Sequence, residues 1–327
     1  MTLGELLSAL GQPEGVSGSA LAERFGVTRA AVWKRIAQLR AAGLRIDAVS
    51  GRGYRLAQPL DLLDARTIRA QLSPPTLALL AALRIDTELD STSSALLRAA
   101  HAGAACGSVC LAEHQTAGRG RRGRQWQSPI AAHCYLSVLW RFDAGLSALG
   151  GLSIAVGVAL AEAARALGAH QAGLKWPNDL VCDQAKLGGV LIDAGGEWAG
   201  PCFAVIGIGL NVRMPPSSAI AIDQVWTDLA HCIDPLPSRC VVAAAVLERL
   251  LPTLQLFAQD GLPPFMPRFA AFDALAGRAL RVHDASGAWH GVAGGIEPDG
   301  RLRVTDDAGI VHRLSAAEVS VRRTIGT

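Results

Sequence analysis

The residues whose types and spacing point most directly to chemistry form a glycine and arginine run between Glu113 and Pro129. Its letters are EHQTAGRGRRGRQWQSP, in which three glycines are interleaved with four arginines. Arginine carries a permanent positive charge and a fork of donors that fits carboxylate and phosphate oxygens. Glycine lets the backbone bend around a ligand. The run therefore predicts a loop that closes over an anionic ligand, although a solvated basic loop is the simpler alternative.

Two lysines stand in further segments that suggest a ligand site. Lys175–Leu180 (KWPNDL) contains Pro177, which cannot sit in a central strand because it has no amide hydrogen. We therefore expect a turn there, with Lys175 and Asp179 near an exposed edge, where they could also simply pair. Lys186–Gly189 (KLGG) places a second lysine beside two glycines, which allow a ligand to approach the backbone closely.

A cluster of hydroxyl side chains, Asp90–Ser94 (DSTSS), lies between a predicted strand at Leu83–Leu89 and a predicted helix at Ala95–Ala102. Hydroxyls in this position can cap the helix or bind the polar end of a ligand. Capping is the simpler of the two interpretations.

The elements that must position these residues alternate between strands and helices. We predict strands over 108–113, 132–142, 186–193 and 203–210, and helices over 65–82, 148–167 and 238–258, with prolines interrupting the first and kinking or breaking the last at Pro252. The most apolar run, 146–160, is short for a membrane span and is followed by charges, so we expect a buried helix. The pattern favours a mixed sheet with helices packed on it.

The N-terminal region has the pattern of a helix-turn-helix. A short helix over Ser19–Phe25 is followed by a tight turn and by a second helix that Thr28 can cap and that runs to about Ala42. Arg29, Lys34 and Arg35 lie largely off the apolar stripe of this helix and could reach phosphates or base edges, whereas we expect Trp33 to pack.

A hairpin over Arg45–Leu56 would add a wing, with Arg52 at its tip. Between Arg24 and Arg55 there are eight basic residues and one acid, which is the charge pattern of a nucleic-acid contact. A protein-interaction module with a solvated basic face is the alternative. We take 58–64 as the linker to the next domain, because Pro59 breaks regular structure there.

Composition and the C-terminal pattern complete the outline. With 327 residues the chain can hold two or three domains. Its seven cysteines form no CxxC, and no secretory signal precedes them, so we expect reduced, mostly buried thiols in a cytoplasmic protein. From about Gly277, short alternating segments separated by Asp-Gly turns predict a small all-β barrel of SH3-like size.

Five segments occur in the order found in biotin protein ligases: DST at 90–92, GRGRRG at 118–123, KWPNDL at 175–180, KLGG at 186–189 and GIGLN at 207–211. The chain resembles this family over nearly its whole length, and GRGRRG together with KWPNDL is a specific signature. The helix-turn-helix makes it similar to the bifunctional bacterial form, which is also the biotin operon repressor. Lipoate ligases share a similar catalytic fold but not the arginine loop.

The resemblance implies an α+β, multidomain fold: a winged helix-turn-helix at 1–64, a mixed-sheet catalytic domain of the class II aminoacyl-tRNA-synthetase/biotin ligase type at 65–272, and an SH3-like barrel at 273–327. It implies that biotin and ATP, with Mg²⁺, give biotinoyl-5'-AMP, and that biotin is then transferred to a lysine of a biotin carboxyl carrier protein. It also implies operator DNA as a partner and a homodimer when the adenylate is bound. No P-loop motif is present, so the arginines take over the cradling of phosphate.

Carried over residue by residue, the resemblance places biotin contacts at Ser91, Thr92, Ser93, Gln115, Arg119, Gly120, Arg121, Lys186 and Gly189. It places ATP and adenylate contacts at Arg119, Arg121, Arg124, Asn211 and Trp226, although Trp226 could be ordinary core. Catalytic roles fall to Lys186, Arg121, Asp179 and Lys175, and we predict no resident metal site. DNA contacts are expected at Thr28, Arg29, Lys34, Arg35 and Arg52.

One position departs from the family pattern. The family commonly has DSTN, and Ser93 stands where the asparagine would be. Either its hydroxyl takes over part of the role, or a water fills the gap, or the position matters less. Two other functions remain open on the sequence alone, namely a biotin-sensing transcription factor without ligase turnover and a lipoate-type ligase.

Overall fold

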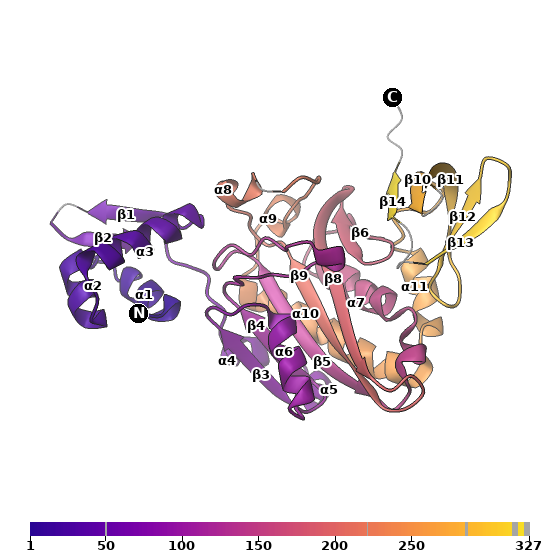
Figure 1. The fold of residues 1–327 in the computed structure, drawn as a ribbon, viewed down its shortest axis with the longest axis horizontal. Helices are drawn as coiled ribbons and strands as arrows, with labels where there is room; N and C mark the ends of the chain where they lie inside the picture. The colour runs from indigo at the N-terminus through magenta and orange to yellow at the C-terminus, as the bar shows by residue number, and fades with distance from the viewer. Residues whose placement is uncertain (50, 221, 285–286, 316–319, 324–327) are drawn as a thin grey trace.

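The computed structural model describes residues 1–49, 51–220, 222–284, 287–315 and 320–323. Three parts follow one another along the chain and along the long axis of the molecule: an N-terminal helical unit, a central α/β domain and a C-terminal β-sheet (Figure 1).

The N-terminal unit is the predicted helix-turn-helix with a hairpin. Its elements are α1 (Leu3–Leu10), α2 (Gly18–Phe25), α3 (Arg29–Ala41), β1 (Ile46–Val49) and β2 (Gly53–Leu56). Gly26 takes a left-handed conformation (φ 62°) that turns the chain between α2 and α3, and Thr28 caps α3 by accepting a bond from Ala31 N. The sequence pattern did not predict α1, whose leucines fill the core of this unit.

The helix-turn-helix unit contacts the central domain through residues beside the ligand-site segments. Ile130 belongs to the same buried cluster as the core of the N-terminal unit. Arg35 Nη2 lies 3.4 Å from Glu88 Oε2, so this side chain of α3 faces the central domain in the structure. Arg29 and Lys34 are exposed on the same helix.

The central domain is built on a seven-stranded mixed sheet with the order β3-β4-β5-β9-β8-β7-β6. Only the pair β3 and β4 is parallel, and the other neighbours are antiparallel. The strands are β3 (Ala82–Asp86), β4 (Ser108–Ala112), β5 (Cys134–Phe142), β6 (Ala172–Lys175), β7 (Asp179–Cys182), β8 (Ala185–Gly196) and β9 (Cys202–Leu210). The predicted mixed sheet is confirmed.

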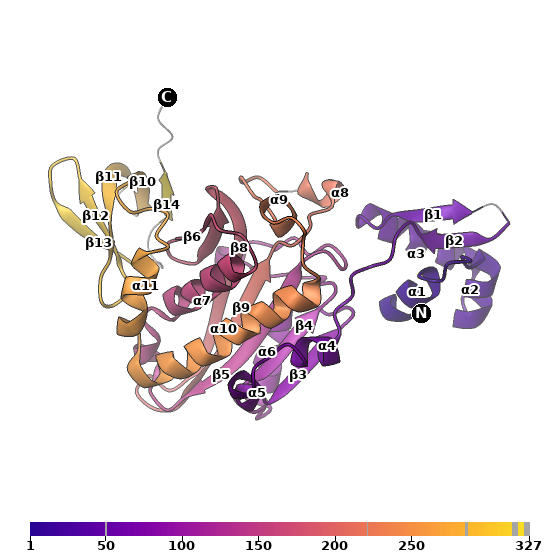
Figure 2. The ribbon, with the colours of Figure 1, turned by 180° about the vertical axis from the view of Figure 1, so that it is seen from behind.

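Two long apolar helices cover one face of this sheet, and α6 (Thr92–His101) covers part of the other (Figures 1 and 2). They are α7 (Leu152–Ala166) and α10 (Arg239–Asp260), which pack on each other and on the sheet. By length and composition Leu146–Ala166, which includes α7, and α10 could each cross a membrane, but more than half of the most apolar window of each (56% and 61%) is buried inside the protein. The prediction of a buried helix is confirmed. Of the predicted kink or break at Pro252, the break is wrong, because α10 continues through this residue.

Shorter elements connect this framework. They are α4 (Ala65–Arg69), α5 (Pro74–Leu79), α8 (Pro216–Ala219), α9 (Leu229–Cys232) and α11 (Met266–Ala270), with 3-10 turns at Arg121–Gly123, Leu146–Leu149 and Pro263–Phe265. Pro74 and Pro75 begin α5 instead of interrupting a longer helix, because proline fits the first helical turn.

The C-terminal part is an antiparallel five-stranded sheet with the order β13-β12-β11-β10-β14. Its strands are β10 (Ala279–Asp284), β11 (Gly287–Ile296), β12 (Leu302–Asp306), β13 (Val311–Leu314) and β14 (Ser320–Arg323), close to the predicted segments. Leu280, Val282, Leu302 and Val304 are fully buried and join the main core.

A buried ion pair ties the interdomain linker to the central domain. Arg239, 2% exposed at the start of α10, donates to Glu113 Oε2 at 2.5 Å. It also donates to the carbonyl oxygens of His133 and Asp61 at 2.6 to 2.9 Å. Glu113 Oε1 in turn accepts a bond from Leu63 N at 2.6 Å. The linker around 61–63 is therefore fixed by Arg239 at the start of α10 and by Glu113 directly after β4.

His133 gives this region a pH dependence that can be measured. Its ring is fully buried, its Nδ1 accepts a bond from Val212 N at 3.0 Å, and burial, helped by Arg239, lowers its pKa to about 3. The unfolded chain binds a proton there below about pH 6.5, and the folded chain does not. We expect the free energy of unfolding to fall by about 2 kcal/mol between neutral pH and about pH 5.

Urea denaturation at these two pH values checks this prediction. His133→Gln should lose most of the dependence, because glutamine does not titrate. An equal fall in the variant and the wild type would contradict the assignment.

Candidate active site

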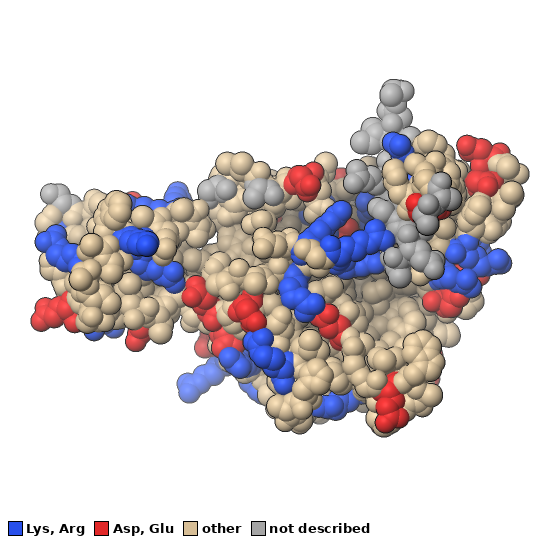
Figure 3. Space-filling model, viewed as in Figure 1, with Lys and Arg blue, Asp and Glu red and all other residues tan. Residues whose placement is uncertain are grey.

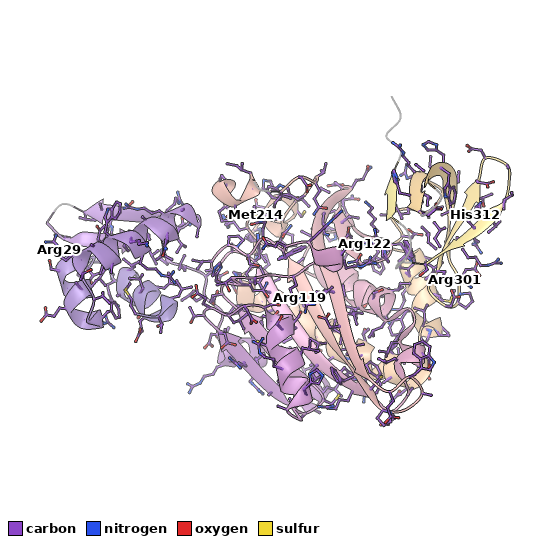
Figure 4. All side chains as sticks on the ribbon, viewed as in Figure 1. Arg29, Arg119, Arg122, Met214, Arg301 and His312 are labelled. Atoms are coloured by element: carbon purple, nitrogen blue, oxygen red, sulfur yellow. The ribbon has the colours of Figure 1, made fainter. Side chains whose placement is uncertain are left out.

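The glycine and arginine loop, the WPND turn and the ends of β8 and β9 meet on one side of the central domain. Figure 3 shows lysine and arginine side chains gathered in a band there, at the place where Figure 4 labels Arg119 and Arg122. The WPND turn joins β6 to β7 at the edge of the sheet, which confirms that Pro177 lies outside the strands.

Lys186 is the cation at the centre of this arrangement. Its Nζ lies 2.8 Å from Asp179 Oδ1 and 5.5 Å from the centroid of the Trp126 ring. Both charged side chains are about four-fifths shielded from solvent. Asp179 therefore pairs with Lys186 across β7 and β8, and the pair holds the ammonium group in a fixed place beside an aromatic wall.

Two glycines make room for this group of side chains. A Cβ at Gly209 would come within 2.4 Å of the Trp126 indole, so the ring lies directly over the backbone of β9. A Cβ at Gly189 would touch Lys186 and Asp179 at 3.5 to 3.6 Å. Gly189 of KLGG and Gly209 of GIGLN therefore leave the space that the Lys186 and Trp126 side chains occupy above the sheet.

Arg121 brings a second cation to the same turn. Its Nη1 donates to Asn178 Oδ1 at 3.0 Å, next to Asp179. Burial is the main cause that lowers the pKa of Arg121, and the neighbouring Arg122 adds to it, yet a guanidinium stays charged at neutral pH. Arg122 adopts φ 56°, which shapes the turn that aims Arg121 inward. A small recess, partly open to solvent, lies between this turn and α7, and Lys175, Asn178 and Asp179 form part of its lining.

Arg119 and Arg124 are not brought to Lys186. Arg119 donates through both terminal nitrogens to the Asp193 carboxylate at 2.9 and 3.0 Å. Asp193 lies four residues beyond Gly189 on β8. Arg119 therefore binds the loop to β8 at a point further along the strand than Lys186 and Gly189. Arg124 is exposed, and its carbonyl accepts a bond from Gly120 N at 2.7 Å.

The hydroxyl cluster lies at the start of α6, which begins at Thr92 and not at the predicted Ala95. Ser91 caps the helix, and Thr92 Oγ1 and Ser93 Oγ both contact Ser137 Oγ on β5, at 2.8 and 3.1 Å. A Cβ at Gly207 would lie 2.3 Å from Ser93 Oγ. Ser93 is therefore a buried member of a hydroxyl chain that reaches the middle of the sheet.

Gln115 connects this chain to the arginine loop. Its Oε1 accepts bonds from Thr92 N at 2.9 Å and Thr92 Oγ1 at 3.2 Å, and its Nε2 donates to Ser128 Oγ at 3.0 Å. A Cβ at Gly118 would clash with Trp126 O at 2.5 Å and Ser128 Oγ at 2.7 Å. The loop therefore needs glycine at this position.

Trp226 and Asn211 lie on the other side of Lys186. The Trp226 segment pairs with Lys186 through Lys186 N to Val225 O at 3.0 Å and Thr227 N to Lys186 O at 2.9 Å. Asn211 Nδ2 donates to Thr227 O at 2.9 Å. The half-buried Trp226 ring meets His231 edge to face, with 6.5 Å between the centroids.

The sequence reasoning missed Trp126 as a site residue. Its indole Nε1 is buried and has no hydrogen-bond partner in the part of the chain that the structure describes. A buried donor without a partner costs free energy, so the position suggests that a ligand supplies the acceptor. A tryptophan two residues after the last arginine of the run was the available signal. Among the described residues, no group of three or more His, Cys, Asp or Glu side chains is placed to hold a metal ion.

Comparison with known proteins agrees with this geometry. A family model described as "HTH domain" matches residues 4–55, and one described as "Biotin/lipoate A/B protein ligase family" matches residues 87–211. The chain is 37% identical over 317 residues to the "Bifunctional ligase/repressor BirA" of Salmonella typhimurium, covering 97% of this chain and 96% of the relative. It is 35% identical over 271 residues to the "Biotin--[acetyl-CoA-carboxylase] ligase" of Mycobacterium tuberculosis, covering 81% and 97%.

A solved structure gives the same result for the fold. The biotin protein ligase of Aquifex aeolicus in complex with biotin and ATP aligns with a TM-score of 0.62 at 25% identity, covering 75% of this chain and all of that one. With its specific motifs, its domain order and its full-length relatives, the chain belongs to the family of bifunctional biotin ligase/repressor proteins.

Proposed function

We propose that this protein is an ATP-dependent biotin protein ligase that also acts as a DNA-binding repressor of biotin biosynthesis genes. It joins biotin to AMP and then transfers biotin to a lysine of a biotin carboxyl carrier protein. The observation that carries the ligase activity is the convergence of Lys186, Asp179, Arg121 and Trp126 over glycine-bearing strands.

In the first step a biotin carboxylate oxygen attacks the α-phosphorus of ATP, and the bond to pyrophosphate breaks. Two anionic groups must approach each other, so fixed cations stabilise the transition state more than water does. Lys186 contacts the carboxylate and the α-phosphate, and Asp179 holds its ammonium in place. Arg121 adds a second charge from the loop, and Lys175 contributes from β6. Mg²⁺ enters with ATP as part of the substrate.

Biotin occupies the side of the site that carries Trp126 and the hydroxyl chain. Ser91, Thr92, Ser93 and Gln115 position its polar ring, with the hydroxyls already aligned by Ser137. The backbone at Gly120 and Gly189 approaches its tail and carboxylate. Asn211 and Trp226 line the adenine side.

The arginine loop has partners that change when ligands bind. Arg119 is held by Asp193 in the present structure, and a nucleotide phosphate competes with that carboxylate for the same fork of donors. Arg119 and Arg124 then move onto the adenylate and close the loop, which shields the mixed anhydride from water. In the second step the acceptor lysine attacks the acyl carbon, AMP leaves, and Asp179 orients the incoming amine.

The repressor function follows from the N-terminal part. We assign residues 1–64 to the winged helix-turn-helix, 65–272 to the catalytic domain and 273–327 to an SH3-like domain. Thr28, Arg29, Lys34 and Arg52 contact operator DNA, and Arg35 joins them once released from Glu88. The protein is cytoplasmic and binds a two-fold operator as a homodimer when the adenylate is present.

Exchange of labelled pyrophosphate into ATP tests the ligase assignment. We expect exchange that requires biotin and is absent with lipoate. Exchange with lipoate alone would instead favour a lipoate-type ligase.

Replacing the indole donor of Trp126 separates its two roles. We expect Trp126→Phe to raise KM for biotin about 3- to 10-fold and to change kcat little, because a ring remains beside Lys186 but the buried hydrogen bond is lost. Trp126→Ala should be worse on both parameters. Steady-state adenylation at varied biotin checks this, and an unchanged KM in Trp126→Phe would contradict a ligand bond to Nε1.

A further inference from the structure

The helix α3 exposes one large apolar side chain that is largely uncovered by the described residues of the chain. Trp33 is 64% exposed on this helix, although the sequence suggested that it would pack. No aromatic ring in the described ranges of the chain stacks on its indole. Ala30 and Ala37 lie one turn before and one turn after Trp33 and are also exposed. Their side chains are small, so the helix surface around Trp33 is open to a partner.

The surroundings of Trp33 are cationic. Lys34 is its exposed neighbour, and Arg29 begins the same helix one turn earlier. The helix-turn-helix unit has eight basic residues and one acid between Arg24 and Arg55. A large apolar side chain surrounded by basic residues is complementary to the DNA major groove. The groove is flanked by negatively charged phosphates and displays apolar groups on its bases.

We propose that Trp33 is a specificity-determining residue that reads thymine, by packing its indole on the C5-methyl group in each half-site of the operator. The methyl of thymine is the apolar group that base pairs display in the major groove. Indole has one donor and no acceptor, so most of its surface favours an apolar partner over a base-edge hydrogen bond. The inference rests on the proposed DNA-binding function and names the base that this helix selects.

A neutral contact to a base and a charged contact to a phosphate affect DNA affinity and its salt dependence differently. Replacing Lys34 removes one phosphate partner, so Lys34→Ala should weaken binding to all sequences and lower the salt dependence of affinity by about one unit of slope. Replacing Trp33 removes no charge. Trp33→Ala should therefore weaken specific binding, leave non-specific binding nearly unchanged and leave the salt slope intact.

The experiment begins with duplexes selected from a random pool by the full-length protein in the presence of biotin and ATP. We expect the wild type to select a fixed thymine in each half-site and Trp33→Ala to lose that preference. Replacing this thymine by deoxyuridine removes only the methyl group, and it should weaken wild-type binding about fourfold per half-site. The same replacement should not affect binding by Trp33→Ala, while Trp33→Phe should keep part of the effect.

Retained biotin-dependent pyrophosphate exchange and helix content show that Trp33→Ala is folded. The inference is overturned if Trp33→Ala selects the same sequences with equal affinity, or if deoxyuridine weakens both proteins equally. Loss of self-association at unchanged DNA affinity also overturns it and would assign this face to a protein contact. If the wild type selects no sequence at all, the repressor assignment fails together with the inference.

Discussion

Lys186→Ala should slow formation of the acyl adenylate by about 10²- to 10³-fold, the range expected when one preorganised electrostatic group is removed from an active site. Lys186 is the side chain that Asp179 holds beside Trp126 and over the glycines of β8 and β9. Its loss leaves the Asp179 carboxylate facing the incoming carboxylate and phosphate, so repulsion adds to the lost attraction. Biotin-dependent exchange of labelled pyrophosphate into ATP measures this step directly.

Two further variants locate the effect. Asp179→Asn keeps the cation but frees it from its partner, so we expect a smaller fall in exchange than for Lys186→Ala. Arg66→Ala removes an exposed cation on α4 and should exchange at the wild-type rate. Wild-type exchange by Lys186→Ala would remove this residue from the mechanism.

Arg239→Met should lower the free energy of unfolding by about 3–5 kcal/mol, which is typical when one partner of a buried ion pair is removed. The change leaves Glu113 charged and buried, with Leu63 N as its remaining donor, and it strips donors from the carbonyls of His133 and Asp61. Chemical denaturation followed by circular dichroism measures it. Because Glu113 lies two residues before Gln115, KM for biotin should rise as well.

A second substitution tests the cause. Arg239→Met combined with Glu113→Gln should recover part of the loss, because no unpaired charge stays buried. Arg301→Ala is the matched control: its pair with Asp299 is about half exposed on both sides and should contribute less than about 1 kcal/mol. Equal effects of Arg239→Met and Arg301→Ala would contradict the role of burial.

The local sequence signals predicted most elements well. Thr28 caps α3, Pro177 lies in a turn, and the C-terminal strands lie within a few residues of the predicted segments. These features depend on neighbouring residues, through caps, turns and alternating patterns, so the sequence carries them directly. The first helix was missed although Thr2 and Glu5 form a capping box at its start, which is a local signal in the sequence. Pro252 did not end α10, because tertiary packing outweighed local preference there.

The sequence predicted which residues belong to the candidate site, but not which side chains would contact one another. The motifs identified Lys186, Asp179 and Arg121 as site residues, but they did not show that Asp179 would form an ion pair with Lys186. Arg119 and Asp193 are 74 positions apart, and Arg239 and Glu113 are 126 apart. Such contacts follow from the strand order of the folded sheet, to which no local pattern gives access. The exposure of Trp33 has the same origin, since it depends on which helices pack beside α3.

Mass spectrometry of a purified biotin carboxyl carrier domain, incubated with this protein, biotin and Mg²⁺-ATP, tests the central claim most directly. The ligase assignment predicts that one lysine of the carrier gains the mass of a biotinyl group, and that omission of ATP or replacement of biotin by lipoate abolishes the gain. An unmodified carrier, despite biotin-dependent binding to DNA, would contradict it and leave a biotin-sensing transcription factor without ligase turnover.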